Sequence, residues 1–452
     1  MARTQSHADT RDKNGATPAT MIKDGEALEL RERYVMPLPG PMYSTPLELA
    51  RGQGQFVYDK DGAKYLDAFA GVATISIGHC HPYFVEKIHD QMKELFHTSP
   101  IYVHPQLGRY AMRLIERVRA ANPELEMCFF TNSGAEANEL AAMLAKNYTG
   151  SHEFVALRHA YHGRTMMAAA LTGQAAWRHS MPYPSGVVHA MANYAYRRPR
   201  GMTAQDFTAF CVQDFKNQIE TSTSGRIAAF YAEPINGVGG VITPEPAYFP
   251  AVYEIVKKAG GLWVSDEVQT GVYRTGGSFL GIEKWGVKPD IVTMAKGLGN
   301  GYPIGAVVTT RNIADAMKGK PHFNTFGGSP VQMAAANAVL DVLEMEKIPD
   351  NVTVVGAKLL KGLKEIESRS RWAGEARGKG LMLGLELVKD KETKEPATQE
   401  AVRVLDLMKD RKVLIGRGGI CGNVLRIKPP LCFTAKDVDV LLSALEDSLK
   451  SL

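Results

Sequence analysis

Long apolar runs are missing from the chain, and none approaches the roughly 20 residues that a membrane-spanning helix requires. The first 30 residues lack the apolar segment of a signal peptide, and their mixture of Arg and Lys with Asp is untypical of a transit peptide. No cluster of basic residues is dense enough to indicate nucleic-acid binding, although the formal net charge is +5. We therefore expect no membrane or nucleic-acid partner, and a tail over residues 1–30 that is flexible or ordered by a protein partner.

Cysteine is scarce, and its pattern excludes two kinds of site. The five cysteines are odd in number, widely spaced and contain no C-x-x-C pair, which argues against a disulfide framework and against a zinc site. We therefore expect no metal and a reducing compartment, with the cytoplasm as the location. The cysteines are Cys80, Cys128, Cys211, Cys421 and Cys432.

Two common nucleotide-binding motifs, G-x-x-x-x-G-K-[S/T] and G-x-G-x-x-G, are also absent. What is present is typical of a soluble globular protein. The 452 residues are 45 % hydrophobic and 22 % charged, and a chain of this length predicts two closely associated domains.

Short apolar runs alternate with helical patterns between residues 106 and 308, which is typical of a mainly parallel sheet covered by helices, an α/β architecture. Ligands of such sheets bind beyond the carboxyl ends of the strands. All the expected strands except the last end in polar residues. They cover residues 126–130, 153–157, 227–233, 262–266, 290–295 and 305–310.

The flanking regions predict a smaller α+β unit. Residues 54–71 contain an Asp-Gly turn between alternating runs and predict a hairpin. After Pro330 the pattern predicts a long helix, several short strands, a helix over 399–410, and a last helix with a capping pair at Thr434 and Asp437. We expect a tail (1–30), an N-terminal segment that joins the smaller domain (31–85), a large domain (86–330) and a small C-terminal domain (331–452).

The segment TMAKGLGNGYP places Lys296 directly after the apolar strand 290–295 and before a glycine-rich turn. One interpretation is a surface lysine that caps a turn, as most lysines near glycines do. The other is an amine in a dry pocket, where burial lowers its pKa and makes it a nucleophile toward a carbonyl.

The segment FFTNSGAEANE runs from a strand into a helix. Its small residues Ser133, Gly134 and Ala135 allow backbone N–H groups to approach an anion at the positive end of the helix, which predicts a phosphate site. The alternative is an ordinary helix cap made by Ser133.

Two further strand ends carry candidate residues. In AYHGRT, Tyr161 is placed to stack on a planar ring or to pack in the core, and His162 is expected to be structural.

In SDEVQTG, Asp266 ends an apolar strand, where a buried carboxylate is costly unless it meets a cation such as a protonated pyridine. Val268 would then face the back of the ring and Gln269 its polar edge. The alternative is that Asp266 caps the following turn.

A phosphate site, a stacking tyrosine, a buried aspartate and a lysine at a strand end are together what pyridoxal 5′-phosphate (PLP) requires. The motifs then resemble the class III aminotransferases of PLP fold type I, over residue 41 to the C-terminus. These motifs are GHCHP, NSGAEANE, AYHGRT, AEPINGVGG, SDEVQTG, TMAKGLGNGYPIGAV and FNTFGGSP, in the family order.

The resemblance implies a role for each matching residue. It makes Lys296 the residue that forms the Schiff base and moves protons, and Asp266 the partner of the pyridine nitrogen. It places Tyr161 on the ring face and Gln269 near the ring hydroxyl, with Gly134 and Ala135 on the phosphate. Ser133, Glu233 and Val268 complete the cofactor site.

Two more residues follow from the resemblance. Thr325 in FNTFGG would reach the phosphate of a neighbouring subunit, which implies a homodimer with composite sites, or a tetramer. Arg426 in VLRIKPPL would bind a substrate carboxylate.

The sequence departs from the family at one place. Relatives that use 2-oxoglutarate commonly have E-P-x-Q-x-E, whose second glutamate pairs with the carboxylate-binding arginine. Here EPINGVGG keeps Glu233 but has Asn236 and Val238 in the other two positions. Arg426 is therefore ungated, which means that it lacks the glutamate that pairs with the arginine in those relatives. The nearest resemblance is to alanine–glyoxylate type 2 and β-alanine or 3-aminoisobutyrate–pyruvate aminotransferases.

We therefore expect ping-pong transfer of an amino group from alanine or an ω- or β-amino acid to pyruvate or glyoxylate. Several alternatives stay open at this point. One is a 2-oxoglutarate-dependent ω-aminotransferase of the 4-aminobutyrate or ornithine type. A racemase, decarboxylase or aminomutase could share the fold, and a non-catalytic protein could keep the scaffold.

Overall fold

The structure is a computed structural model that describes residues 26–38 and 40–452. The expected tail therefore lies almost entirely outside the described residues, and its last five residues, 26–30, begin helix α1 (Glu26–Tyr34). Within the described ranges, every helix is too short or too polar to cross a membrane.

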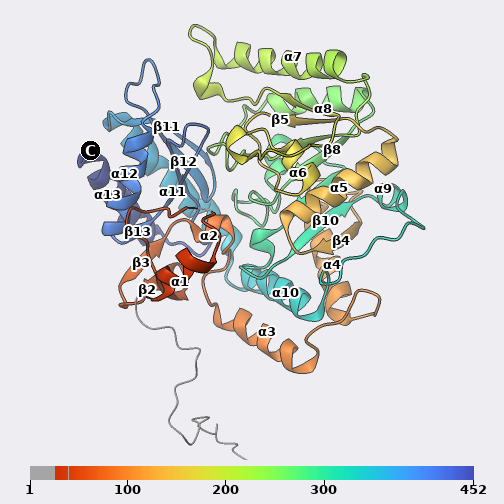
Figure 1. Ribbon diagram of the computed structural model, residues 1–452, viewed down its shortest axis with the longest axis horizontal. Helices are drawn as coiled ribbons and strands as arrows, with labels where there is room; N and C mark the ends of the chain where they lie inside the picture. Colours follow the sequence, from red (N-terminus) through yellow and green to blue (C-terminus); the bar gives the residue numbers. More distant parts are fainter. Residues whose placement is uncertain (1–25, 39) are drawn as a thin grey trace, which may run out of the picture.

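A sheet of seven strands forms the large body of the molecule, on the right in Figure 1. Its strand order is β4-β10-β9-β8-β7-β5-β6, and all strands run in the same sense except β10, which is antiparallel to both neighbours. This confirms the mainly parallel α/β sheet expected of a PLP-dependent transferase of fold type I. The strands are β4 (Met127–Thr131), β5 (Phe154–Leu157), β6 (Val187–Ala190), β7 (Ala229–Ala232), β8 (Leu262–Asp266), β9 (Ile291–Met294) and β10 (Gly305–Thr309).

Two differences from the sequence-based expectation have simple causes. Strand β10 is antiparallel because only residues 295–304 separate it from β9, which is too short for a crossover helix. Strand β6 was not predicted because the polar His189 interrupts its apolar run, as is common in a strand at the edge of a sheet.

Helices cover both faces of this sheet because its strand residues alternate between two apolar clusters. On β5, Phe154 and Ala156 pack with α5 and α6, whereas Val155 and Leu157 belong to the cluster that contains α7 and α8. The helices of the large body are α3 (Pro82–Glu94), α4 (Pro105–Val118), α5 (Gly134–Thr149), α6 (Met166–Leu171), α7 (Ala204–Ser222), α8 (Tyr248–Lys258), α9 (Arg311–Asp315) and α10 (Pro330–Met345). Short 3-10 helices cover Ala175–Trp177, Ala195–Arg197, Gly281–Trp285 and Lys296–Leu298.

The C-terminal part forms a second, four-stranded sheet in the order β11-β12-β15-β14 (Figure 1). Helix α13 begins at the expected Thr434–Asp437 capping box. Helix α11 and strand β11 were not predicted. The elements are α11 (Ile348–Arg369), β11 (Ala373–Lys379), β12 (Met382–Leu387), α12 (Thr398–Asp410), β13 (Val413–Leu414), β14 (Gly416–Gly418), β15 (Val424–Ile427) and α13 (Ala435–Lys450).

The N-terminal strands join this part, as expected. The predicted hairpin is β2–β3, and β13 pairs with β3 in a sheet of order β1-β2-β3-β13. The domain limits themselves stay a prediction. The remaining elements are β1 (Leu49–Gln53), β2 (Phe56–Asp59), β3 (Lys64–Asp67) and α2 (Ala70–Ala73).

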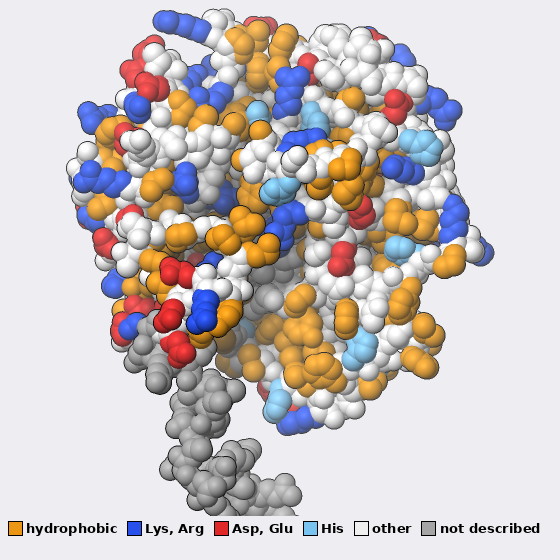
Figure 2. Space-filling view, viewed as in Figure 1, with side chains coloured by type: hydrophobic (Ala, Val, Ile, Leu, Met, Phe, Trp, Pro, Cys, Tyr) orange, Lys and Arg blue, Asp and Glu red, His pale blue; other side chains and the backbone are white. Residues whose placement is uncertain are grey.

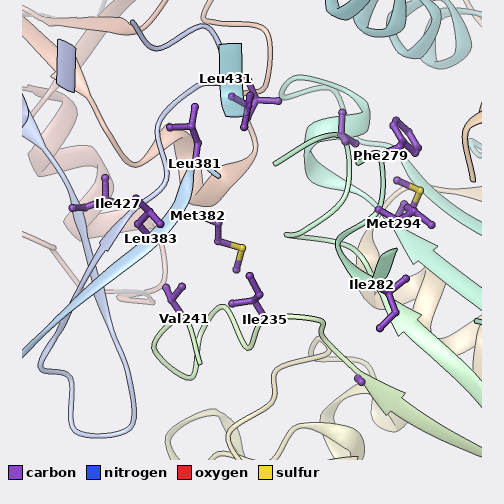
Figure 3. Close-up of a cluster of buried hydrophobic side chains, with 14 of the residues drawn as sticks. Ile235, Val241, Phe279, Ile282, Met294, Leu381, Met382, Leu383, Ile427 and Leu431 are labelled. Atoms are coloured by element: carbon purple, nitrogen blue, oxygen red, sulfur yellow. The ribbon is translucent and has the colours of Figure 1, made fainter. Parts of the chain in front are cut away.

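Two buried clusters join the C-terminal part to the large body. The first is apolar: Ile235 and Val241, from the loop after β7, lie near Met382 and Leu383 of β12 (Figure 3). This loop also borders the pocket described below, so the packing fixes the pocket wall.

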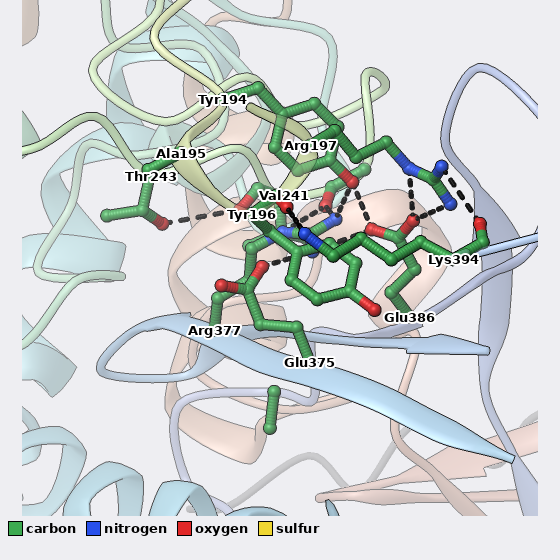
Figure 4. Close-up of polar contacts among 12 residues, drawn as sticks. Tyr194, Ala195, Tyr196, Arg197, Val241, Thr243, Glu375, Arg377, Glu386 and Lys394 are labelled. Atoms are coloured by element: carbon green, nitrogen blue, oxygen red, sulfur yellow. Dashed lines mark hydrogen bonds and ion pairs between the residues drawn. The ribbon is translucent and has the colours of Figure 1, made fainter. Parts of the chain in front are cut away.

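The second cluster is polar (Figure 4). Arg377 of β11 donates to Glu386 at 2.8 Å and to the Gly240 carbonyl at 2.6 Å, and Arg197 donates to Glu386 at 2.6 Å. Tyr194 also contacts Glu386. The loop that contains Gly240 is therefore held by charged hydrogen bonds as well as by apolar packing.

Candidate active site

A pocket of about 350 Å³ lies beyond the carboxyl ends of β4, β5, β7, β8 and β9. Nine of the eleven predicted site residues line it, and Thr325 and Arg426 do not. The nine are Ser133, Gly134, Ala135, Tyr161, Glu233, Asp266, Val268, Gln269 and Lys296.

Lys296 follows the end of β9 in a left-handed backbone conformation, with φ of +46°. This conformation is unfavourable for lysine and is typical of residues that a functional site constrains. No described residue forms a hydrogen bond or ion pair with its Nζ. Burial lowers the pKa of the amine, and the carboxylates of Asp266 and Glu233 oppose that shift. A larger fraction of the amine is therefore neutral than for an exposed lysine, as nucleophilic attack requires.

Asp266 ends β8 and is only 3 % exposed. Its Oδ2 accepts hydrogen bonds from Asn138 Nδ2 and from His162 Nδ1, both at 2.8 Å, and its Oδ1 accepts one from the Val268 backbone at 3.1 Å. Asp266 therefore does cap the following turn, but it is also held by two side chains. These contacts fix a carboxylate at the pocket wall, where it can bind a cationic ring nitrogen.

The N-terminus of α5 supplies the anion site. Ser133 is the N-cap, and its Oγ accepts from the Glu136 N–H at 3.2 Å, so the helix cap and the phosphate site coexist. The N–H groups of Gly134 and Ala135 have no acceptor among the described residues. A Cβ on Gly134 would lie 2.7 Å from Val268, so only glycine fits here. Free N–H groups at a helix N-terminus suit a phosphate.

Tyr161 and Glu233 are linked to each other. The backbone N–H of Tyr161 donates to Glu233 Oε1 at 2.9 Å, and Glu233 Oε2 accepts from the Gly237 N–H at 2.8 Å. The half-buried ring of Tyr161 lies edge-on against Trp177, with centroids 5.0 Å apart. Burial raises the pKa of Glu233 to about 7. Glu233 thus ties the tyrosine to the loop after β7.

Arg426 lies on β15, outside the residues that line the pocket. Its Nε donates to the Arg417 carbonyl at 3.0 Å, and its buried Nη1 has no partner. Among the described residues, no carboxylate lies within 4.0 Å of this guanidinium. Arg426 therefore keeps unused donors, as a carboxylate-binding residue requires.

Thr325 is exposed and is not among the residues that line the pocket of its own chain. Its expected role at the phosphate of a neighbouring subunit stays a prediction.

Three residues that contact predicted site residues had no functional assignment from the sequence. Asn138 and His162 hold Asp266, and Lys428 donates to Gln269 Oε1 at 2.8 Å. A signal existed for Asn138, because it lies on the buried face of α5 between Ala137 and Ala141, where a polar residue needs a partner.

These residues fit PLP. The free N–H groups at α5 match a phosphate, the fixed Asp266 carboxylate matches a pyridine nitrogen, and the amine of Lys296 matches an aldehyde. When bound, the cofactor supplies an electron sink for the carbon that carries the substrate amino group.

Comparison with known proteins agrees with this geometry. The family model "Aminotransferase class-III" matches residues 41–449. The chain is 44 % identical over 425 residues to an Arabidopsis thaliana protein named alanine–glyoxylate aminotransferase 2 homolog 2, mitochondrial, covering 94 % of this chain and 87 % of that protein.

Two solved structures are also similar. One is an amine transaminase from an uncultivated Pseudomonas species in a PLP-bound form, with 34 % identity, a TM-score of 0.85, and coverage of 92 % of this chain and 98 % of that one. The other is a phospholyase from Arthrobacter in complex with phosphoethanolamine, with 33 % identity, a TM-score of 0.86, and coverage of 94 % and 100 %. The chain belongs to the class III aminotransferases, which are PLP-dependent enzymes.

Proposed function

We propose that this enzyme moves an amino group from alanine or from a β- or ω-amino acid, such as β-alanine or 3-aminoisobutyrate, to pyruvate or glyoxylate. The observation that carries the choice of acceptor is the ungated Arg426, whose buried Nη1 has no partner.

The residues of the pocket would divide the work as follows. The amine of Lys296 would hold the cofactor aldehyde and would take up and return the proton of the substrate Cα. Asp266 would keep the ring nitrogen protonated, and Tyr161 would pack on the ring. Ser133, Gly134 and Ala135 would bind the phosphate, while Glu233, Val268 and Gln269 would complete the wall around the ring.

The loop after β7 supports the proposed acceptor. The Val238 carbonyl accepts from the Gly419 N–H at 3.1 Å, which places this loop against the β14–β15 turn next to the strand of Arg426. An apolar valine there offers no partner to a second carboxylate. Pyruvate and glyoxylate need only one cationic partner, whereas 2-oxoglutarate brings a second charge that would be buried without compensation.

We expect kcat/KM for pyruvate or glyoxylate to exceed that for 2-oxoglutarate by about 10- to 100-fold, the effect of one uncompensated polar group. The measurement compares the three acceptors with β-alanine as the common donor, since alanine with pyruvate gives no net reaction. Equal or better efficiency with 2-oxoglutarate would contradict the proposal and favour an ω-aminotransferase of the 4-aminobutyrate or ornithine type.

Other PLP reactions are distinguished with the same preparation. Racemisation of L-alanine without an acceptor would indicate a racemase. Release of inorganic phosphate from phosphoethanolamine would indicate a phospholyase like the Arthrobacter structure. The proposal expects neither at a rate that approaches transamination.

We further propose a homodimer in which Thr325 serves the partner's phosphate site. Thr325 lies between Phe323 and Phe326, which are both exposed, and the Phe326 ring lies 5.6 Å from that of His97. Val103 is also completely exposed. Hydrophobic side chains gather on the lower part of the large body (Figure 2). Exposed apolar surface of this kind favours an interface.

A mixed dimer tests this arrangement. We expect a dimer of one Lys296→Ala chain and one Thr325→Ala chain, purified through two different tags, to regain about half of the wild-type activity, because one of its sites then carries both lesions and the other neither. Each homodimeric variant is the control. If Thr325 instead serves its own chain, the mixed dimer will be no more active than half of the Thr325→Ala homodimer.

We also propose a reducing compartment, with the cytoplasm as the location, since all five cysteines are free. The Arabidopsis relative is named mitochondrial. Subcellular fractionation decides between the two, and recovery in mitochondria would contradict the proposal.

A further inference from the structure

Lys428 is a completely buried lysine for which the proposed reaction has no use. It directly follows β15 and has no exposed surface. None of the described carboxylates lies within 4.0 Å of its Nζ. Its contacts are the Gln269 Oε1 at 2.8 Å and the Gly237 carbonyl at 3.4 Å, both neutral acceptors. A buried amine with only neutral partners is costly, so its position calls for a specific explanation.

The residue that Lys428 contacts lies at the pocket. Gln269 follows β8, is 6 % exposed and lines the pocket together with Asp266 and Lys296. Its amide oxygen is occupied by Lys428, so the amide NH₂ is on the other side of the group. No acceptor for this Nε2 is present among the described residues. The amide oxygen of Gln269 is therefore satisfied, whereas its NH₂ group keeps free donors.

Gly237 prevents the amide from moving away. A Cβ on Gly237 would lie 2.5 Å from Gln269 Nε2 and 2.6 Å from its Oε1, so the glycine backbone packs directly on the amide. The Gly237 carbonyl also accepts from Lys428. The amide of Gln269 is thus held between a backbone and a buried amine, and lysine can donate in its charged and its neutral form.

We propose that Lys428 is a positioning residue that fixes the Gln269 amide with its NH₂ toward the pocket, so that the chain presents an N–H donor to the ring hydroxyl of PLP. This inference rests on the proposed PLP site. It assigns to Lys428 no contact with substrate or cofactor.

The consequence is a shift in the pH at which the bound cofactor changes its absorption. A donor to the ring oxygen would stabilise its deprotonated form, so the bound cofactor would lose its proton at lower pH. Without the donor, the midpoint pH of this change in absorption should rise by about one pH unit, the effect of one hydrogen bond. The charged groups that act on Lys428 are Arg426, Lys296, Glu233 and Arg274, and burial lowers its own pKa well below the usual range.

The experiment is a pH titration of the absorption spectrum of the PLP-loaded enzyme. We expect Lys428→Met and Gln269→Leu each to raise the midpoint by about one pH unit. The double variant should match Gln269→Leu alone, because Lys428 acts only through Gln269. The matched control is Lys412→Met, which removes a lysine that donates to the Tyr65 hydroxyl at 3.0 Å outside the pocket and should leave the midpoint unchanged.

Each other outcome overturns the proposal. An unchanged midpoint in Lys428→Met beside a shifted one in Gln269→Leu would make Lys428 merely structural. A further shift in the double variant would mean that Lys428 acts directly through its charge. An unchanged midpoint in Gln269→Leu refutes the donor even if Lys428→Met does not fold. A wild-type protein without a PLP absorption band would instead refute the proposed function.

Discussion

Replacing Lys296 with alanine should lower turnover by roughly 10⁴-fold or more, because in the proposed reaction one amine would both hold the cofactor aldehyde and move the proton of the substrate Cα. PLP should then be bound only without a covalent link to the chain. This expectation rests on the position of Lys296, which lies directly after β9 in a left-handed backbone conformation. No described residue forms a hydrogen bond or ion pair with its amine. The measurement is the rate of amino transfer from β-alanine to pyruvate.

The matched control is Lys257→Ala. Lys257 is also partly buried, but it pairs with Asp290, immediately before β9 and so at the end of the strand away from the pocket. Turnover of this variant should stay within a few-fold of wild type. Near-normal turnover by Lys296→Ala would contradict the PLP mechanism, regardless of the turnover of Lys257→Ala.

Replacing Asp266 with asparagine should lower kcat by roughly 10²- to 10³-fold, the usual effect of removing one preorganised electrostatic contact. Asparagine keeps the shape and removes the charge, so the ring nitrogen loses its proton more readily and the electron sink weakens. The fold should survive, because Asn138 can still donate to an amide oxygen. The checks are kcat and the thermal unfolding midpoint.

Asp290→Asn provides the same chemical change directly before β9, at the end of the sheet away from the pocket. Asp290 accepts from the Trp263 backbone at 2.7 Å and lies outside the pocket. Its kcat should change little. If Asp266→Asn also left kcat unchanged, Asp266 would be only the turn cap that its contact with the Val268 N–H suggests.

The pattern of apolar runs was sufficient to predict most of the sheet, because buried parallel strands are short and continuous in hydrophobicity. Strands β4, β5, β7, β8 and β9 lie within a few residues of their predicted limits. The direction of β10 was not predicted, since direction depends on the length of the connection and on the neighbours. Helix α11 was also missed, although it has a clear buried face.

The residues of the site were predictable where they follow a strand end, since the sheet brings such ends together. The residues that hold them were not predicted, although the position of Asn138 on the buried face of α5 was a signal. Asn138, His162 and Lys428 come from different elements and meet Asp266 or Gln269 only in the folded chain. The proposed role of Thr325 in a partner's site came from the family resemblance alone, because such a role depends on a second subunit.

Borohydride reduction of the PLP-loaded protein, followed by digestion and mass spectrometry, locates the lysine that binds the cofactor. We expect the yellow colour to be lost on reduction and the pyridoxyl group to be found on the peptide that contains Lys296. A protein that stays colourless with added PLP, or a pyridoxyl group on another lysine such as Lys428, would contradict this expectation.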